Sequence, residues 1–325
     1  MKWSALAEKV HQSLTRNPLL KKKDKILIAL SGGMDSVVLL HVLLELQSRW
    51  QWDLIVGHID HGLRPDEDEK ESGLCKELAQ HAGLPYYEES LTLDSVETEP
   101  LVNYGTQKPS LESMARHRRY QVFQRWAEEI HCDAVCTAHH LSDQAETIFY
   151  RLLTGSGLKG LKGIPDSRHV FKRPLLNISK KEIREYAKKY KLDYLEDSSN
   201  ADEKFIRNRI RRKVFPYLRH IGFEQAEDML ASSARSVEEA NEALGFYAGK
   251  AYKDLIVEDG ELLRIDLDKF TALPVFIKKT LVRKIFKDFL RVKKHLSEKQ
   301  LDELISFAGS AETGTASVLM DNRIL

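Results

Sequence analysis

Cysteine is scarce in this chain, and long apolar runs are missing. The 325 residues contain three cysteines, Cys75, Cys132 and Cys136, which are too few and too scattered for a disulfide framework. The residues after Met1 lack the apolar core of a signal peptide, and no run approaches the length of a membrane span. We therefore expect a cytoplasmic protein without a membrane partner.

The chain also lacks a strong overall charge. Its formal net charge is +1, and its 42% hydrophobic and 30% charged residues are typical of a globular protein long enough for two domains. Charge is uneven, however: Phe171 to His220 holds fifteen Lys/Arg and seven Asp/Glu, a local net charge of +8. This block predicts a polyanionic partner on one face, with a solvated helix face as the alternative.

The common phosphate-binding motif GxxxxGK[ST] does not occur. A different glycine-rich loop lies between the apolar stretch Ile26–Leu30 and a helical pattern, and it reads Ser31-Gly32-Gly33-Met34-Asp35-Ser36. Glycine lets backbone approach a ligand closely, and the N–H groups that begin a helix bind anions. The loop predicts a cradle for nucleotide phosphates. A Ser/Gly turn that caps a helix is the alternative.

Strands and helices alternate through the first part of the chain. The expected strands are Ile26–Leu30, Leu54–Ile59, Pro85–Ser90 and Ala134–Ala138, and the expected helices are Asp35–Arg49, Glu67–Ala82, Ser110–Ile130 and Ser142–Leu153. This order predicts an α/β fold with a doubly wound parallel sheet. In such folds ligands bind beyond the carboxyl ends of the strands.

The alternation stops after Pro216. Three helices and one short strand are expected there, over Phe223–Tyr252, Leu262–Ile265, Pro274–Val292 and Ser297–Phe307. We therefore expect one domain over residues 1–217 and a smaller, mainly helical domain over 218–325. Asp94 to Pro109 is punctuated by Pro, Asn and Gly and is expected to form a loop.

One glycine motif is rejected as a nucleotide site. Gly155 to Gly160 matches GxGxxG, but it follows a helical pattern and no helix is expected to open after it. The dinucleotide fingerprint requires a strand, then the glycines, then a helix. We expect a loop here.

Polar residues follow the second and fourth strands. Alternation places His58 and Asp60 on one face of a strand, where they would bind ligand or metal, or only support a loop. His139 ends the fourth strand, and Asp143 and Glu146 lie three residues apart on the next helix. The two carboxylates would hold Mg²⁺ or a substrate ammonium group, or would complement the helix dipole.

Arginines recur at helical spacing in two places. Arg116 and Arg119 would face a triphosphate, or Arg116 would pair with Glu112 at the surface. Arg207 and Arg211 lie four apart and are expected to share a helical face that suits phosphates.

Seven ordered motifs in the first 215 or so residues resemble the tRNA(Ile)-lysidine synthase family of N-type PP-loop ATP pyrophosphatases. They are SGGxDS at Ser31–Ser36, HxDHGLR at His58–Arg64, ARxxRY at Ala115–Tyr120, TAHHxxDQAET at Thr137–Thr147, RPLL at Arg173–Leu176, DSSN at Asp197–Asn200 and RNxIR at Arg207–Arg211. The resemblance is weaker afterwards, where the chain looks like the family's helical tRNA-recognition domain. Longer members continue with a further domain, which we expect to be absent here.

The resemblance implies a reaction in two steps. ATP with Mg²⁺ would adenylate carbon 2 of the wobble cytidine in tRNA(Ile) with a CAU anticodon, and the side-chain amine of free L-lysine would then displace AMP to give lysidine. It also implies three overlapping sets of residues. The ATP set is Ser31, Gly32, Gly33, Met34, Asp35, Ser36, His58 and Asp60; the catalytic set is Asp35, Arg116, Arg119, His139, Asp143, Glu146 and Arg207; the lysine and tRNA set is Asp143, Glu146, Arg173, Asn200, Arg207 and Arg211. Asp35 and Asp143 would hold Mg²⁺.

Other functions remain open at this point. A related tRNA thiolase would need a catalytic cysteine or an iron–sulfur cluster, and this chain has no CxxC. A glutamine-dependent ligase would need an amidotransferase domain, for which there is no candidate. An RNA-binding module with a relic nucleotide fold would retain tRNA without consuming ATP. The sequence leaves the oligomeric state open, a homodimer included.

Overall fold

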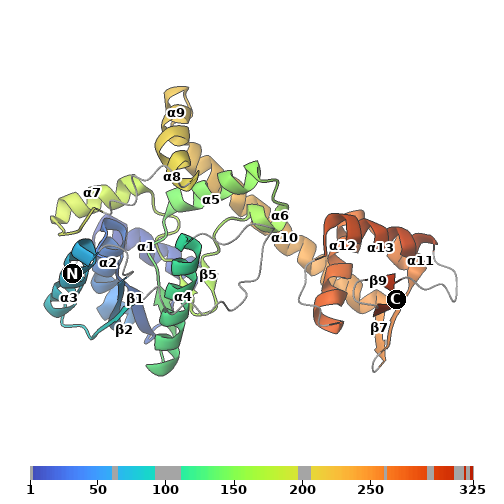
Figure 1. Ribbon diagram of the computed structural model, residues 1–325, viewed down its shortest axis with the longest axis horizontal. Helices are drawn as coiled ribbons and strands as arrows, with labels where there is room; N and C mark the ends of the chain where they lie inside the picture. The colour runs from blue at the N-terminus through green and yellow to red at the C-terminus, as the bar shows by residue number, and fades with distance from the viewer. Residues whose placement is uncertain are drawn as a thin grey trace. The chain divides into compact units, whose positions relative to one another are not determined.

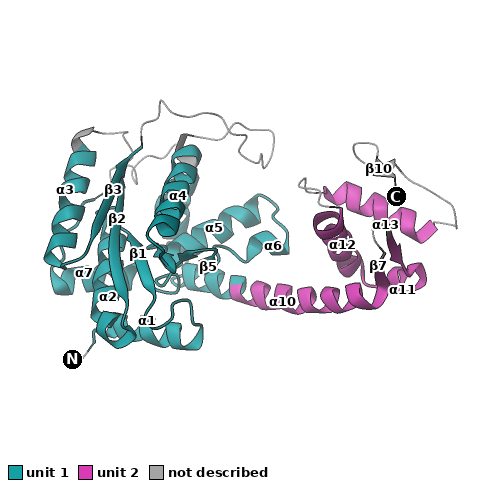
Figure 2. Ribbon diagram, turned by 90° about the horizontal axis from the view of Figure 1, so that it is seen from below, with its two compact units in different colours: residues 1–234 teal, residues 235–325 magenta. Residues whose placement is uncertain are grey.

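The computed structural model describes most of the chain (Figure 1). The described residues are 3–60, 65–91, 111–196, 206–259, 262–290, 296–310, 318–319 and 323–324. They form two compact units, residues 1–234 and 235–325, which are coloured separately in Figure 2. The first unit contains the glycine-rich loop and is an α/β structure, as the alternating pattern predicted.

The sheet of the first unit has six strands in the order β3-β2-β1-β4-β6-β5. The strands are β1 (Lys25–Ala29), β2 (Asp53–Asp60), β3 (Tyr86–Ser90), β4 (Ala134–Cys136), β5 (Ser167–Arg168) and β6 (Phe171–Lys172). The first four strands and β6 are parallel, while β5 is antiparallel to β6. The parallel sheet is therefore confirmed, and β5 and β6 form a short addition that the sequence pattern missed.

Helices cover both faces of this sheet. Those of the first unit are α1 (Ala5–Arg16), α2 (Met34–Trp50), α3 (Pro65–His81), α4 (Leu111–Glu129), α5 (Leu141–Leu153), α6 (Leu158–Leu161), α7 (Lys180–Tyr190), α8 (Ile206–Arg209), the π-helical turn η3 (Ile210–Val214), α9 (Phe215–His220) and the start of α10 (Ala226–Leu255). Helices α1, α2, α3 and α7 pack against one face, and α4 packs against the other (Figure 2).

Strand β1 shows why both faces are covered. Ile26 and Ile28 contribute to the core under α2, whereas Leu27 joins the core under α4. All three side chains are fully buried. A strand that is apolar on both sides belongs in the middle of a sheet with helices on each face, which is where β1 lies.

Two local expectations differ from the structure. The segment Gly155 to Gly160 was expected to be a loop, but the four-residue helix α6 begins within it, after the N-cap Gly157. The helix is too short to show a periodic pattern. Arg207 and Arg211 were expected to share a helical face, but the chain passes from α8 into the wider turn η3 between them.

Helix α10 runs from the first unit into the second. The predicted boundary between residues 217 and 218 lies within α9, whereas the first unit extends to Ala234. Ala226 and Leu230 of α10 join a small core with Phe149 and Phe215, so the start of this helix packs with α5 and α9. Because of this packing, the boundary between the two compact units lies later in the chain than the point where strands and helices stop alternating.

The second unit is mainly helical. Besides the end of α10 it contains the hairpin β7 (Ile256–Asp259) and β8 (Leu262–Ile265), the helices α11 (Leu267–Thr271), α12 (Val275–Lys284) and α13 (Glu298–Ser310), the π-helical turn η4 (Ile285–Phe289) and the strand pair β9 (Val318–Leu319) and β10 (Arg323–Ile324). Its core gathers Ala251, Phe270, Leu281 and Leu301. None of the described helices, in either unit, has the length and apolar character needed to cross a membrane.

Candidate active site

The glycine-rich loop joins β1 to α2 and leaves the start of α2 open. Gly32 adopts φ +76°, a left-handed conformation that favours glycine, and Gly33 is the N-cap of α2 without a side-chain capping bond. The Ser36 hydroxyl donates to the Gly33 carbonyl (2.9 Å) and accepts from the Ser31 N–H (3.1 Å), which ties the loop together. The first N–H groups of α2 are thus presented as an anion site.

A cavity of about 690 Å³ lies beside this loop, at the carboxyl ends of β1 and β4. Its size falls within the usual range for small-molecule sites. The predicted residues that line it are Ser31, Gly33, Met34, Asp35, Ser36, Arg116, Arg119, His139, Asp143 and Arg211. The loop, α4, the end of β4 and the start of α5 therefore meet at one place.

His140 lies between the two aspartates of this site. It is the N-cap of α5: its Nδ1 accepts the Ser142 N–H at 3.2 Å, so Nε2 carries the ring proton. Nε2 lies 3.6 Å from an oxygen of Asp35 and 3.6 Å from an oxygen of Asp143. Burial lowers the pKa of His140, but the two carboxylates outweigh it and the pKa is raised. His140 is not among the site residues predicted from the sequence.

Asp35 is held in its ionised form. Burial raises the pKa of this carboxyl, but the hydrogen bond and charge of His140 and the charge of Lys180 lower it to about 2. Lys180 Nζ donates to Asp35 Oδ1 at 2.5 Å. Lys180 is the first residue of α7, and it also lines the cavity.

Asp143 and Glu146 converge on Arg211. Arg211 donates from Nε and Nη2 to the two oxygens of Glu146 (2.5 and 3.1 Å) and from Nη2 to Asp143 (3.1 Å). Only 3% of Glu146 is exposed, and burial outweighs Arg211, so the pKa of Glu146 is raised. The pKa of Arg211 is also raised, since its carboxylate partners outweigh burial. This pair of acids forms a site that already binds a cation.

His139 is a neutral imidazole. Its Nδ1 lies 3.0 Å from the Thr137 hydroxyl, and its Nε2 lies 3.4 Å from Arg116 Nη2. Because a guanidinium can only donate, Nε2 accepts and Nδ1 carries the proton. Burial lowers the pKa of His139 to about 3; Asp143 opposes this, and nearby arginines reinforce it. His139 therefore has little capacity to accept a proton near neutral pH.

Several predicted residues do not line the cavity. His58 is only 1% exposed, and its Nδ1 donates to the Leu30 carbonyl at 2.9 Å. On β2 it is Ile59, on the other face of the strand, that lines the cavity. Asp60 accepts from the Ser90 hydroxyl at 2.5 Å, and buried Arg173 donates to the Pro165 carbonyl at 2.7 Å. These residues support the loops around the cavity.

The remaining predicted residues are placed differently. Arg207 is exposed on α8 and does not line the cavity, in contrast to Arg211. Asn200, like the other residues of 197–200 and like 61–64, lies outside the described residues, as does the predicted loop from Asp94 to Pro109. The side chain of Glu112 is also outside them, so its predicted pairing with Arg116 stays a prediction.

The main residues that sequence reasoning missed are His140, Lys180 and Arg184, the last of which also lines the cavity from α7. A signal for α7 exists in the sequence: Ser179 and Glu182 form a capping box, with bonds in both directions. That motif places the start of a helix just after the RPLL block, and thus near the edge of the sheet.

Magnesium requires oxygen ligands, and it is usually held by one or two carboxylates together with substrate phosphates. Within the described part of the chain, no group of three or more His, Cys, Asp or Glu side chains could hold a metal ion. Asp35 and Asp143 approach the same His140 nitrogen, and both line the cavity beside the phosphate loop. Two carboxylates next to a phosphate site fit Mg²⁺ that arrives with a nucleotide.

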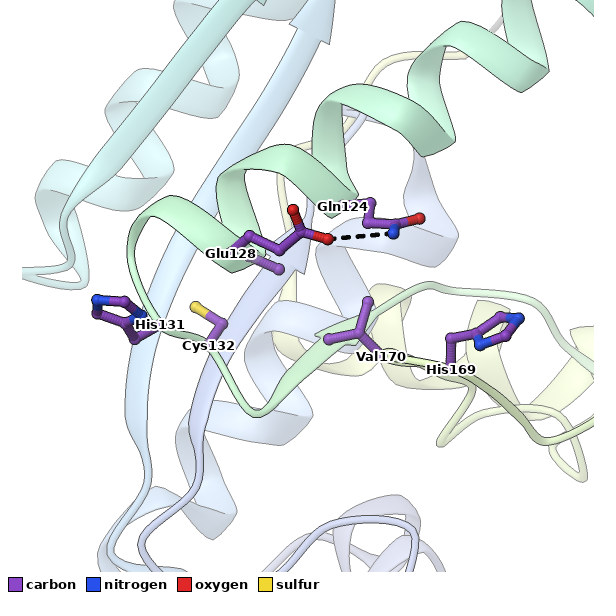
Figure 3. A pocket seen from close by; sticks show the side chains of 7 residues that line it. Gln124, Glu128, His131, Cys132, His169 and Val170 are labelled. Carbon is purple, nitrogen blue, oxygen red and sulfur yellow. Dashed lines mark hydrogen bonds between the residues drawn. The ribbon is translucent and has the colours of Figure 1, made fainter.

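A second depression, of about 580 Å³, lies at the opposite ends of the strands (Figure 3). Glu128 and Gln124 share a hydrogen bond there, while His131 and His169 lie at opposite sides of the group. The Cys132 thiol is half-buried, and burial raises its pKa to about 11. A protonated thiol and separated imidazoles give this depression no catalytic or metal-binding arrangement.

The comparisons with known proteins agree with this geometry. The PP-loop domain family matches residues 4–218. A tRNA(Ile)-lysidine synthase from Synechococcus sp. is 31% identical over 327 residues, which cover 99% of this chain and 94% of that protein. One from Nostoc sp. is 30% identical, covering 89% and 85%, and one from Clostridioides difficile is 29% identical, covering 97% and 67%.

A solved structure has the same fold at low sequence identity. The U34-tRNA thiolase NcsA from Methanococcus maripaludis, solved with its [4Fe-4S] cluster, superposes with a TM-score of 0.57 at 20% identity. The match covers 72% of this chain and 78% of NcsA. Since the family model covers most of the chain and the Synechococcus relative matches almost end to end, this chain belongs to the tRNA(Ile)-lysidine synthase family of PP-loop proteins.

Proposed function

We propose that this protein is an ATP-using ligase that joins L-lysine to carbon 2 of the wobble cytidine in tRNA(Ile) with a CAU anticodon. One observation carries the proposal: the phosphate loop lines the same cavity as Asp143 and Arg211, and Arg211 is the cation that Asp143 and buried Glu146 bind together. A ligase of this type must bring a triphosphate and an amine together. Family membership supports tRNA(Ile) as the substrate that is modified.

In the first step, the loop and the start of α2 hold the phosphates of ATP. The oxygen on carbon 2 of the cytidine attacks the α-phosphorus, the bond to the β-phosphate oxygen breaks, and pyrophosphate leaves with the electron pair. Arg116 and Arg119, on α4, line the cavity and stabilise the charge that develops on the phosphates. Asp35 and Asp143 would hold Mg²⁺, which neutralises phosphate charge when bound.

In the second step, Asp143 and Glu146 bind the side-chain ammonium group of lysine. Their present partner is the guanidinium of Arg211, another cation, which supports the assignment. Lysine is almost entirely protonated near neutral pH and must lose a proton before its amine can attack.

Glu146 is the best-suited proton acceptor. Its pKa is raised by burial, whereas the low pKa of His139 makes that ring a poor base. His140 already carries a proton on Nε2, directed at the aspartates. The neutral amine then attacks carbon 2, and AMP leaves with the original oxygen.

The second unit and the basic block serve tRNA binding in this proposal. Residues 235–325 form the second compact unit, and we assign them to tRNA recognition. The basic stretch from Phe171 to His220 supplies Arg209, Arg212 and Lys213 on the surface of α8 and η3. Exposed cations suit a phosphate backbone.

Sulfur transfer, the reaction named for NcsA, is not supported by the cysteines here. Cys75 and Cys136 are buried, and burial raises the pKa of both thiols. None of the three cysteines lines the cavity, and all three lie in the described part of the chain. A lysine nucleophile, by contrast, would take the place of Arg211 on an acidic pair that binds a cation in the structure.

Labelled L-lysine tests the proposal. The protein is incubated with ATP, Mg²⁺ and an isoleucine tRNA transcript that carries a CAU anticodon; a transcript with U at the wobble position is the control. We expect lysine in the cytidine transcript alone. Pyrophosphate release without lysine incorporation would overturn the lysine step, and tRNA binding with neither signal would favour an RNA-binding module.

A further inference from the structure

The start of α7 forms a basic wall of the cavity. Lys180 and Arg184 lie four residues apart, on the same side of this helix, and both line the cavity. Lys181 and Glu185 pair with each other on a different side, where 84% of the Lys181 side chain is exposed. Only one side of α7 thus presents its cations to the site.

Lys180 reaches the phosphate loop itself. Its Nζ bonds to Asp35, the second residue of α2, at the point where the loop presents its N–H groups. Arg116 and Arg119 approach the same cavity from α4, which packs on the other face of the sheet. Cations from α7 and α4 therefore border the phosphate loop from two sides, which suits a ligand with several phosphates.

Helix α7 is a firm support for this pair of cations. Its buried side chains Ile183, Tyr186 and Ala187 belong to the same core as α1 and α2. The Tyr186 hydroxyl is hydrogen-bonded to His41 (2.7 Å) and Glu45 of α2. Glu182, the only acid in the first turn, is engaged by Ser179 and Lys9, so it does not neutralise the basic wall.

We propose that Lys180 and Arg184 form a subsite for the β- and γ-phosphates of ATP, which holds the pyrophosphate leaving group. The inference rests on the function proposed above and adds two residues to it. Lys180 exchanges its bond to Asp35 for phosphate oxygens, and its side chain, 33% exposed, has room to do so. Asp35 would then be free of this bond and could hold Mg²⁺.

Binding measurements with the full chain test the subsite. Isothermal titration gives the affinities of wild type, Lys180→Met and Arg184→Met for ATP, pyrophosphate and AMP. We expect ATP and pyrophosphate to bind roughly 10- to 100-fold more weakly to Lys180→Met, the loss typical of a charge-assisted hydrogen bond, and AMP to bind as before. Lys181→Met is the matched control and should change none of the three.

A second comparison separates phosphate binding from neutralisation of Asp35. In an Asp35→Asn background, adding Lys180→Met should still weaken ATP binding if Lys180 contacts phosphate. If Lys180 acts only by neutralising Asp35, the second substitution will have no effect there, and the subsite is refuted. Equal loss of AMP affinity would refute it as well.

The same titrations distinguish the two proposals. If wild type binds no ATP, the proposed function fails together with the subsite. If wild type binds ATP and incorporates lysine while Lys180→Met binds ATP normally, only the subsite fails. Lys180→Arg keeps the positive charge and should bind ATP nearly as tightly as wild type. Its recovery would show that the weaker binding of Lys180→Met is due to the lost charge and not to a folding defect.

Discussion

Removal of Arg211 should destabilise the first unit in a way that depends on pH. Arg211 makes three bonds to Glu146 and Asp143, and the Glu146 side chain is only 4% exposed. Breaking a buried ion pair by removing one partner usually costs about 3–5 kcal/mol. Since 37% of the Arg211 side chain is exposed, we expect Arg211→Met to lose about 3 kcal/mol at high pH.

The pH dependence follows from Glu146. Its pKa is already raised above the ordinary value of 4.5, and loss of Arg211 raises it further. An acid with a raised pKa binds more protons in the folded state, so stability falls as pH rises from 4.5 through the folded pKa. The loss should therefore be smaller near pH ~5.5 than near pH ~8.

Urea unfolding followed by tryptophan fluorescence measures this directly. All four tryptophans, Trp3, Trp50, Trp52 and Trp126, lie in the first unit, so the signal reports on that unit alone. Arg209→Met, which removes an exposed arginine two residues away, is the control and should change stability little. Glu146→Gln together with Arg211→Met should lose less than Arg211→Met alone at high pH. Equal losses at both pH values would refute the reasoning.

Three further predictions concern the loop and the start of α5. Gly32→Ala should lose roughly 1 kcal/mol because φ +76° strains any residue with a Cβ, whereas Gly73→Ala, in α3 with open space around it, should gain up to about 1 kcal/mol; urea unfolding measures both. Asp143→Asn should reduce labelled-lysine incorporation at least ~100-fold, and near-normal turnover would remove Asp143 from the mechanism. His140→Ala should cost about 1–2 kcal/mol near pH ~6 through loss of the charged contacts of His140 with Asp35 and Asp143. The pKa of His140 is raised in the folded state, so protonated His140 stabilises the fold below the ordinary pKa of 6.5. This stabilisation is lost as pH rises through the folded pKa. The loss of unfolding free energy in His140→Ala, measured by urea titration, should therefore be smaller at alkaline pH.

The middle of the sheet could be predicted because β1 and β4 are continuous apolar runs. Ile26–Leu30 and Ala134–Ala138 stand out between turn and helix signals, and both correspond to strands of the structure. β5 and β6 have only two residues each, which is too short for any period to be visible. Phe171 joins the sheet through its pairing with Val135, a contact between distant segments that local sequence does not contain.

The location of the site could be predicted from topology, but its ion pairs could not. Motifs that follow parallel strands meet at one edge of the sheet, so Asp35 and Asp143 were expected near each other. The bond between Lys180 and Asp35 joins residues 145 positions apart, and it depends on how α7 packs against α2. No spacing rule within either segment indicates it.

Strand alternation separated His58 from Ile59 but gave no basis for choosing which of them faces the cavity. In a sheet covered on both sides, both faces are buried, and the usual contrast between a wet and a dry face is lost. His58 lies under the loop, on the side of Leu30, and Ile59 reaches the cavity. Likewise, the i,i+4 spacing of Arg207 and Arg211 gave no basis for expecting that only Arg211 lines the cavity.

The most direct test of the account follows the oxygen on carbon 2 of the wobble cytidine. A tRNA(Ile) transcript with ¹⁸O at that position is reacted with ATP, Mg²⁺ and L-lysine, and the released AMP is analysed by mass spectrometry. Adenylation of that oxygen, followed by attack of lysine on carbon 2, predicts one ¹⁸O atom in AMP for every lysine incorporated. Incorporation of lysine with unlabelled AMP would contradict the adenylated intermediate and the roles assigned to the residues around it.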